Sequence, residues 1–316
     1  MSQRLKGKNA VVTGSSYGIG KAIALAMAAE GARVVVNSSG SGPKGPGTNL
    51  KPLNDVVDEI KARGGVATAS CGSVADFDYA GRLIKECVDN FGSIDILVNN
   101  AGIAELNSII DTPVEVWHQV IAVHLDGTFN CCKHACSLMA RQSSGRIINV
   151  GSHAFLGVGS GSSYAAAKGG IISLTKTIAN DMREYGVTCN VFCPQGKTRM
   201  SSMPGYEENL NVLLDKGLIT EEQKKFSLNL PDPEFVPPLI LYLATDEAAN
   251  ITGQVFTIIG GYVGLFPEPK EVPLIYRNHK KYGPWTVDEI AELLPSKLGV
   301  YMANPSPPKT SSENST

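Results

Sequence analysis

The feature that most constrains the fold is the glycine-rich run TGSSYGIG at residues 13–20, together with its neighbours. Apolar residues 9–13 predict a strand before the run, and the alanine-rich residues 19–30 predict a helix after it. Glycines at 14, 18 and 20 permit a tight turn and let backbone N–H groups approach a pyrophosphate closely. Residues 32–37 supply the next strand, so the context of a dinucleotide-binding turn is present.

Strand-like and helix-like patterns then alternate along the chain. Helices are expected at residues 53–63, 77–91, 114–141, 164–185 and 233–244, and strands at 66–71, 94–98, 147–150, 187–193 and 254–259. This alternation predicts an α/β fold in which a doubly wound parallel sheet of the Rossmann type is joined by right-handed crossovers.

Two segments interrupt the pattern. Residues 194–229 are polar and irregular with a helical pattern of their own, which is typical of a lid. We therefore expect a catalytic domain at 1–261, with its lid at about 194–229, and a proline-rich extension at 262–316. Within the extension a short helix is predicted at 287–294, capped by Thr286 with Glu289 three residues later, and residues 306–316 are expected to be disordered.

The bulk properties exclude several classes of protein. A net charge of -2 and a pI near 6.2 give no reason to expect nucleic acid or an anionic membrane as a partner. Residues 1–8 do not resemble a signal peptide, and no apolar run approaches the roughly 18 residues of a membrane span. A cytoplasmic location is therefore expected. The cysteines do not follow zinc-site spacing, so structural thiols are favoured over a metal site; they are Cys71, Cys87, Cys131, Cys132, Cys136, Cys189 and Cys193.

A candidate reaction centre lies at residues 146–170. Ser152 follows an apolar strand, and Tyr164 and Lys168 open a helical pattern after a glycine- and serine-rich loop. Positions i and i+4 share one helix face, so the ammonium is expected to lower the phenol's pKa of about 10 and to make Tyr164 an acid or base. The alternative is an exposed aromatic residue beside an exposed charge.

The end of the second strand bears on cofactor choice. Asn37, Ser38 and Ser39 stand where NAD-binding proteins often carry a carboxylate, and this favours NADP over NAD. Lys44 or Arg33 is a candidate for the positive charge near a 2′-phosphate, although Tyr17 occupies a place where a basic residue would help. The loop at 37–50 is interpreted either as a flap over the site or as a flexible insertion.

With the glycine-rich run, NNAG at 99–102, and Ser152, Tyr164 and Lys168 in this order, the sequence resembles the short-chain dehydrogenase/reductase family over residues 5–261. NSSGSGPKGPG, VHLDGTF and PQGKTRM are similar to the hydroxyacyl-CoA dehydrogenase branch of peroxisomal multifunctional enzymes. The resemblance implies an NAD(P)-dependent oxidoreductase for a ketone or secondary alcohol, either a 3-hydroxyacyl thioester or an alicyclic or steroid-like compound.

The resemblance also implies roles for individual residues. Tyr164 is expected to be the acid or base, Lys168 to hold the nicotinamide ribose, and Ser152 to bind the substrate oxygen. Asn99 is expected to shape the cofactor turn and Thr198 to contact the carboxamide. No metal site is expected, and the expected cofactor-binding residues are Gly14, Ser16, Tyr17, Gly18, Ile19, Gly20, Asn37, Ser38, Ser39, Asn99, Ala101, Gly102, Tyr164, Lys168, Pro194, Gly196 and Thr198.

Three positions depart from the family pattern. Ser152 precedes Tyr164 by twelve residues, one fewer than expected; the substitutes Ser160, Ser162 and Ser163 are less favoured because none follows a strand directly. His124 stands where the family often has an asparagine that holds a water of the proton relay, so His124 either holds that water or packs in the core. Gly72 replaces an aspartate that commonly contacts adenine.

Substrate and assembly are the least constrained expectations. An apolar substrate or ordinary lid packing both account for the apolar residues near the site, which are Phe155, Leu156, Met200, Met203 and Tyr206. The family implies a homodimer or homotetramer formed through the helices at 114–141 and 164–185. His124 and the shortened serine interval also leave an alternative function, a catalytically weak dinucleotide-binding sensor or scaffold.

Overall fold

The structure, a computed structural model, describes residues 3–40, 49–105, 107–157, 161–202, 204–269, 271 and 275–298. Its centre is one eight-stranded sheet with the order β3-β2-β1-β4-β5-β6-β7-β8. The strands are β1 Asn9–Val12, β2 Arg33–Ser38, β3 Val66–Cys71, β4 Ile96–Asn99, β5 Gly145–Val150, β6 Val187–Gln195, β7 Val255–Ile259 and β8 Tyr262–Leu265. All neighbours from β3 to β7 pair in parallel, which confirms the predicted doubly wound α/β sheet.

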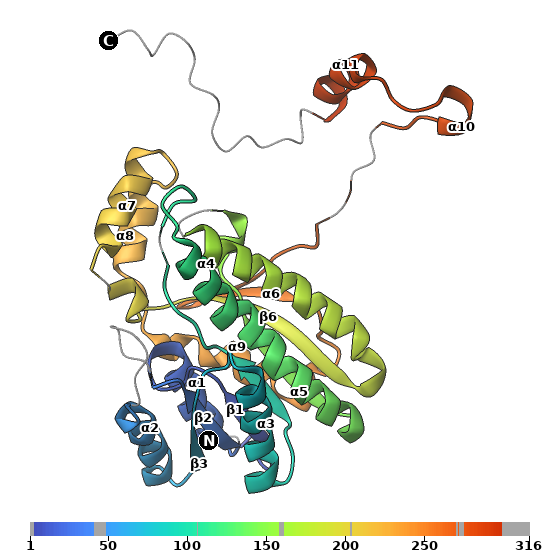
Figure 1. The fold of residues 1–316 in the computed structure, drawn as a ribbon. Helices are drawn as coiled ribbons and strands as arrows, with labels where there is room; N and C mark the ends of the chain where they lie inside the picture. The colour runs from blue at the N-terminus through green and yellow to red at the C-terminus, as the bar shows by residue number, and fades with distance from the viewer. Residues whose placement is uncertain are drawn as a thin grey trace. The chain divides into compact units, whose positions relative to one another are not determined.

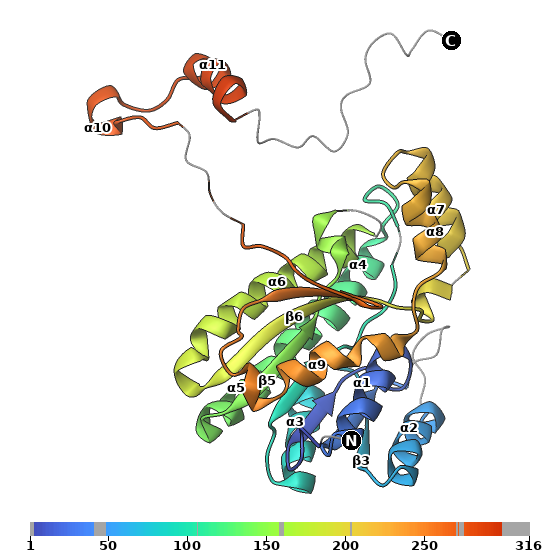
Figure 2. The same cartoon turned by 180° about the vertical axis from the view of Figure 1, so that it is seen from behind.

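Helices cover both faces of the sheet (Figures 1 and 2). Successive side chains of a strand point to opposite faces of the sheet. In β1, Val12 accordingly packs in one hydrophobic cluster and Val11 in the other. On the first face lie α1 Gly18–Ala29, α2 Lys51–Ala62 and α9 Pro237–Leu243, and on the second lie α3 Phe77–Phe91, α5 Gly127–Gln142 and α6 Ser162–Asp181.

The helix expected at 114–141 is not continuous. It consists of α4 Val114–Ile121, a π-helical turn at Ala122–Asp126, and α5. A π turn closes hydrogen bonds over one more residue than an α turn and is found often at functional sites. Residue periodicity does not reveal such a turn, so the prediction of one regular helix was wrong at this point.

The sheet continues beyond the expected boundary at residue 261. β8 pairs antiparallel with β7, and the first compact unit extends to Phe266. The proline-rich composition after Gly261 gave no sign of this strand, whose side chains are mostly exposed at the edge of the sheet.

The second unit, Pro267–Thr316, contains two helices in its described part. These are α10 His279–Tyr282 and α11 Val287–Leu298. The Thr286 hydroxyl accepts from the Glu289 backbone N–H at 3.2 Å, and the Glu289 carboxylate accepts from the Thr286 backbone N–H at 2.8 Å. The predicted capping box is thus confirmed, whereas the expected disorder of residues 306–316 lies outside the described residues.

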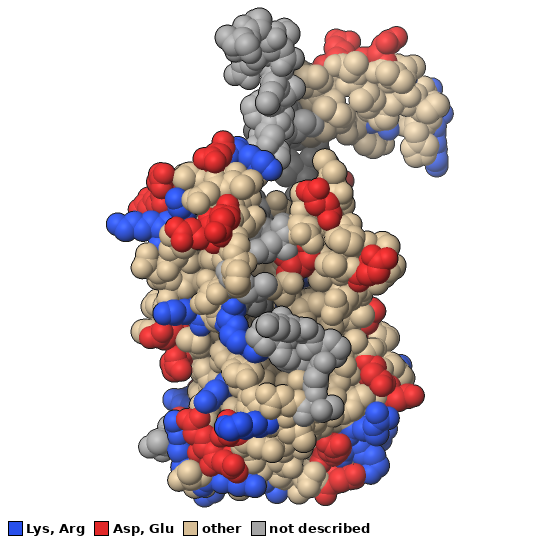
Figure 3. Space-filling view, turned by 60° about the vertical axis from the view of Figure 1, so that its left-hand side comes forward, with Lys and Arg blue, Asp and Glu red and all other residues tan. Residues whose placement is uncertain are grey.

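Neither the surface charge nor the hydropathy of the described helices indicates a particular kind of partner. Basic and acidic side chains of the described residues are interspersed on the face of the first unit shown in Figure 3. None of the helices in the described ranges is both long enough and apolar enough to cross a bilayer.

Candidate active site

The glycine-rich turn, residues 13–20, lies at the carboxyl end of β1, where the strand order reverses between β1 and β4. Gly14 has a φ of +62°, and a Cβ on it would meet the Ala101 Cα at 2.6 Å. A Cβ on Gly20 would lie 2.4 Å from both the Asn100 Nδ2 and the Gly14 carbonyl oxygen. Only glycine fits at both positions, so the turn has the close-packed shape expected of a pyrophosphate cradle.

Asn100 and Thr13 hold this turn against the end of β4. The Asn100 Nδ2 donates to the carbonyls of Thr13 and Gly14, each at 3.0 Å, and the Thr13 hydroxyl accepts from the N–H groups of Asn100 and Ala101. Asn99 was expected to shape the turn, but its amide instead donates to the Asn149 Oδ1 at 2.8 Å, joining β4 to β5. It is the side chain of Asn100, and not that of Asn99, that contacts the glycine-rich turn directly.

At the end of β2, two of the three expected cofactor residues, Asn37 and Ser38, have different surroundings. Asn37 is buried, and its amide donates to the Gly72 carbonyl at 3.2 Å and to the Tyr79 hydroxyl at 3.0 Å. The Ser38 hydroxyl accepts from the Ser16 hydroxyl at 3.1 Å, which joins the glycine-rich turn to the end of β2. Ser38 and Ser16 are therefore better placed than the Asn37 side chain to meet a ribose.

Of the two candidates for a nearby positive charge, the structure places only Arg33. Arg33 begins β2, so it lies at the opposite end of the strand, where its Nε donates to the Asn9 Oδ1 at 2.7 Å. Lys44, like most of the expected flap, lies outside the described residues. The replacement of the adenine-contacting aspartate by Gly72 has a packing reason, because a Cβ there would lie 2.2 Å from the Tyr79 ring.

The structure brings together Ser152, Tyr164 and Lys168, which we call the reaction cluster. Ser152 follows β5 and caps a 3-10 turn at His153–Leu156, and its hydroxyl shares a hydrogen bond with the Tyr164 phenol. Ser162 pairs instead with Thr112 at 3.1 Å, and the Ser163 hydroxyl donates to Glu105. The shortened interval therefore does not prevent Ser152 from reaching Tyr164, and the remaining substitute, residue 160, lies outside the described range.

Burial controls the protonation of the reaction cluster. The Lys168 Nζ donates to the Val150 carbonyl at 2.7 Å and lies 5.4 Å from the centre of the Tyr164 ring. Desolvation lowers the pKa of Lys168 to about 7 and raises the pKa of Tyr164 to about 12, although the hydrogen bond from Ser152 opposes the rise for Tyr164. The pKa of Tyr164 is therefore raised by burial instead of lowered as expected, and the phenol keeps its proton at neutral pH.

His124 lies in the π turn and is buried against Tyr164. The two rings meet edge to face, with centroids 5.0 Å apart and an interplanar angle of 87°. Its Nε2 is within 3.0 Å of both the N–H and the carbonyl of Ile103, whereas its buried Nδ1 has no partner among the described residues. Burial lowers the pKa of His124 to about 3, so it is a neutral packing partner of Tyr164 with one polar atom left available for hydrogen bonding.

Glu105 is a residue of the site that sequence reasoning missed. It is buried, accepts from the Ser163 hydroxyl at 2.7 Å, and lies against the Cα of Gly161, where a side chain would clash with its carboxylate. Gly161 begins α6 without a side-chain cap, so the carboxylate lies where a helix N-terminus favours negative charge. A single acidic residue in a loop gives no motif, and only the fold reveals that it holds the start of the helix that carries Tyr164.

The segment after β6 crosses the glycine-rich turn. A Cβ on Gly18 would lie 3.4 Å from the Thr198 Cγ2, and the Arg199 guanidinium carbon lies 3.8 Å from the centre of the Tyr17 ring. Beyond it, α7 Tyr206–Asp215 and α8 Glu221–Leu228 form the region expected to be a lid. The contact between Thr198 and the turn agrees with the expected cofactor position, whereas the contact between Arg199 and Tyr17 was not anticipated.

Some of the apolar residues expected near the substrate pack against other side chains, and one is exposed. Phe155 packs against Phe266 with centroids 5.1 Å apart, and the Tyr206 hydroxyl pairs with Ser227 within the lid region. Leu156 is 58% exposed, so it alone of these three offers an open apolar surface. The Met200 side chain and residue 203 are outside the described part of the structure.

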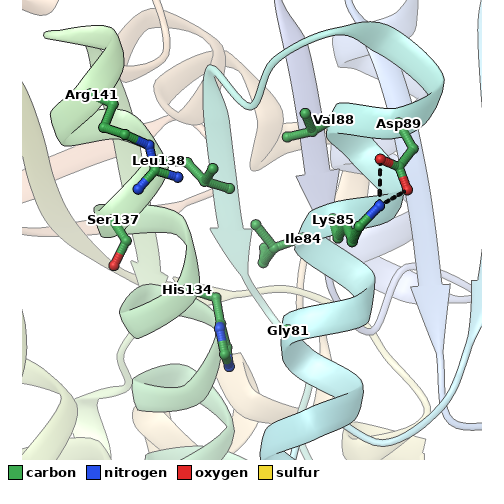
Figure 4. Close-up of a pocket in the computed structure, with 9 residues that line it drawn as sticks. All are labelled: Gly81, Ile84, Lys85, Val88, Asp89, His134, Ser137, Leu138 and Arg141. Carbon is green, nitrogen blue, oxygen red and sulfur yellow. Dashed lines mark hydrogen bonds and ion pairs between the residues drawn. The ribbon is translucent and has the colours of Figure 1, made fainter.

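One groove on the protein surface lies apart from this site. This groove, between α3 and α5, is lined by residues that include Ile84, His134 and Leu138, with the Lys85–Asp89 ion pair at its edge (Figure 4). None of its lining residues belongs to the reaction cluster. Across the described ranges no three histidine, cysteine or acidic side chains are grouped so as to hold a metal ion, and all seven cysteines are free.

Comparison with known proteins agrees with this geometry. The family model described as short chain dehydrogenase matches residues 8–204. A 3-oxoacyl-[acyl-carrier-protein] reductase of Synechocystis sp. is 42% identical over 259 residues, covering 80% of this chain and 96% of the reductase. The peroxisomal hydratase-dehydrogenase-epimerase of Neurospora crassa is 33% identical over 90% of this chain, which is 30% of that longer protein. The crystal structure of a short chain dehydrogenase from Mycobacterium avium superposes with a TM-score of 0.77 at 37% identity, covering 93% of this chain and 95% of that one.

Proposed function

The chain belongs to the short-chain dehydrogenase family, and from that premise we propose that it interconverts a 3-oxoacyl thioester and the corresponding 3-hydroxyacyl thioester, using NADP in preference to NAD. The observation that carries this proposal is the reaction cluster. In it the Tyr164 phenol interacts with the Ser152 hydroxyl, and the Lys168 Nζ lies 5.4 Å from the centre of the Tyr164 ring. Ser152 follows β5, which pairs with β4 beside the strand that carries the glycine-rich turn.

The residues of the cluster supply the proton and the stabilisation of charge. A bound nicotinamide supplies the hydride that adds to the carbonyl carbon during reduction, or accepts it during oxidation. Tyr164, protonated at neutral pH, donates its proton to the carbonyl oxygen, while the Ser152 hydroxyl donates a hydrogen bond to the same oxygen. Lys168 in its charged form stabilises the phenolate that remains. In the oxidative direction the same groups act in reverse.

The substrate class is supported by the relatives. The Synechocystis protein is named a 3-oxoacyl-[acyl-carrier-protein] reductase, and the Neurospora protein is named a hydratase-dehydrogenase-epimerase. The exposed Leu156, four residues after Ser152, offers apolar surface to an acyl chain. A 3-oxoacyl thioester is therefore preferred over an alicyclic or steroid ketone.

The cofactor preference is supported by the end of β2. Asn37, Ser38 and Ser39 include no carboxylate that would repel a 2′-phosphate, and the Ser16 and Ser38 hydroxyls are adjacent. We extend the proposal to a homodimer or homotetramer formed through α4, α5 and α6, a family inference.

Steady-state kinetics test the proposed reaction directly. Wild-type protein should reduce acetoacetyl-CoA and longer 3-oxoacyl thioesters with NADPH faster than it reduces cyclohexanone or a 3-ketosteroid. Tyr164→Phe should lower kcat by about 10²- to 10⁴-fold, because it removes the proton donor and keeps the ring.

The affinity for NADPH, measured by fluorescence titration, should be nearly unchanged in Tyr164→Phe. A wild type that binds cofactor tightly but converts none of these ketones would contradict the enzyme proposal. Such a result would favour the alternative of a dinucleotide-binding sensor or scaffold. That alternative was based on His124 and on the shortened interval between Ser152 and Tyr164, and the contact between these two residues removes the second reason.

A further inference from the structure

Arg199 is an exposed cation stacked on an exposed aromatic ring. Its guanidinium carbon lies 3.8 Å from the centre of the Tyr17 ring, a distance at which a cation is attracted by the ring face. Within the described part of the chain Arg199 has no ion-pair partner, unlike Lys21, which pairs with Glu59, and Lys51, which pairs with Asp55. The positive charge of Arg199 is thus uncompensated by any described acidic residue.

The backbone on either side fixes the position of this arginine. The Lys197 N–H donates to the Pro231 carbonyl at 2.7 Å, and the Thr198 N–H donates to the Ser201 hydroxyl at 2.9 Å. Thr198 itself lies against Gly18 of the glycine-rich turn. Arg199 therefore reaches Tyr17 from the segment that follows β6, across the turn that is expected to hold the pyrophosphate.

Tyr17 lies at the adenosine end of the expected cofactor site. It is the N-cap residue of α1 and directly follows Ser16, whose hydroxyl donates to Ser38 at the end of β2. In dinucleotide-binding sheets the end of this strand meets the adenosine ribose, and a nearby arginine accommodates the 2′-phosphate of NADP. Of the two cations considered from the sequence, Arg33 lies at the other end of β2, and residue 44 lies outside the described residues.

We propose that Arg199, presented by its stack on Tyr17, recognises the 2′-phosphate of NADP. Stacking on the ring leaves the N–H edges of the guanidinium free, and this planar fork matches phosphate oxygens in a bidentate manner. The ring also restricts the side chain before the ligand arrives, which lowers the entropy lost on binding. The inference rests on the proposed dinucleotide cofactor. It assigns the preference for NADP over NAD to a residue of the segment after β6, outside the glycine-rich turn.

Calorimetric titration with two small probes tests the inference without any turnover. Adenosine 2′,5′-bisphosphate carries the 2′-phosphate, and adenosine 5′-monophosphate lacks it. Arg199→Ala should weaken binding of the bisphosphate by about 10- to 100-fold and leave the monophosphate nearly unaffected. Arg199→Lys should recover only part of the loss, because lysine keeps the charge but not the planar fork.

Two further variants separate the stack from general charge. Tyr17→Ala keeps Arg199 and removes its platform, so it should weaken bisphosphate binding by less than Arg199→Ala. Lys197→Ala removes an exposed cation two residues away and should leave both affinities unchanged. Circular dichroism of each variant verifies that the fold is retained.

The outcomes distinguish this inference from the proposed reaction. Equal weakening of both probes by Arg199→Ala would overturn the inference, as would a wild type that does not discriminate between them. If the probes are discriminated through Arg199 but no ketone is reduced, the proposed function fails and the assignment of Arg199 stands.

Discussion

Around Gly14 and Gly20 of the glycine-rich turn the contacts are made by backbone groups and small neutral side chains, whereas around Tyr164 they are made by buried ionisable side chains. Asn100 and Thr13 hold the turn through amide and hydroxyl hydrogen bonds. At the reaction cluster, burial shifts the pKa values of Tyr164, Lys168 and His124 in the directions that disfavour charge. The first region is thus characterised by close packing of its backbone, and the second by the protonation states of its side chains. Substitutions in the two regions should therefore fail in different measurements.

The largest of these differences is expected for Ser152→Ala, which should reduce turnover by about 10²- to 10³-fold, as for the loss of an oxyanion donor. The affinity for cofactor should change little, because the Ser152 hydroxyl interacts with Tyr164 and belongs to the reaction cluster, not to the glycine-rich turn. Ser162→Ala is the matched control, since that hydroxyl pairs with Thr112. A near-normal rate in Ser152→Ala would mean that another group polarises the carbonyl.

The opposite behaviour is expected for Gly20→Ala at the turn. Its Cβ would lie 2.4 Å from the Asn100 Nδ2 and the Gly14 carbonyl, so the free energy of unfolding should fall by about 1–3 kcal/mol. Dinucleotide affinity should fall with it. Gly169→Ala in α6 meets no atom within 4 Å and should stabilise the protein by up to about 1 kcal/mol. Urea unfolding of both variants checks the contrast, and equal effects would show that close packing at the turn is not what requires glycine.

The smallest effect is a pH dependence at His124. The unfolded chain takes up a proton on this imidazole below pH 6.5, whereas the folded chain does so only near pH 3, so folding stability is lost as the pH falls through this window. When the pH is lowered from 7 to 5, the free energy of unfolding of wild type should therefore fall by about 1–2 kcal/mol more than that of His124→Asn. His118→Asn, at an exposed position of α4, controls for the loss of one imidazole. Parallel stability curves for wild type and His124→Asn would contradict the buried neutral state of this ring.

Much of the fold follows from local signals. The predicted bounds of α3 agree with the structure because Asp76 caps its first turn and Gly92, in the left-handed conformation, ends it. β3 also has its predicted bounds. β8 was missed because an antiparallel edge strand with exposed side chains lacks the apolar alternation that marks a strand. The π turn was missed because it preserves the helical composition around it.

The site was predictable where a motif carries its function and not where a partner is distant in sequence. Tyr164 and Lys168 were found because helical spacing places them together. Glu105 is separated from Ser163 by 58 positions, and Arg199 meets Tyr17 only through the path of the segment after β6. Which asparagine of NNAG holds the turn depends on the direction in which each side chain leaves the strand, and the order of residues alone does not determine it.

The π turn at Ala122–Asp126 has a consequence for how the chain tolerates insertions and deletions. One residue advances an α-helix by about 100° around its axis, so the turn sets the rotational phase of α5 relative to α4. Deleting a single residue here would restore a regular helix. Either His124 would then be rotated away from Tyr164, or the buried face of α5 would be rotated away from the sheet. The length of this segment is thus under a constraint that substitution of individual residues would not reveal.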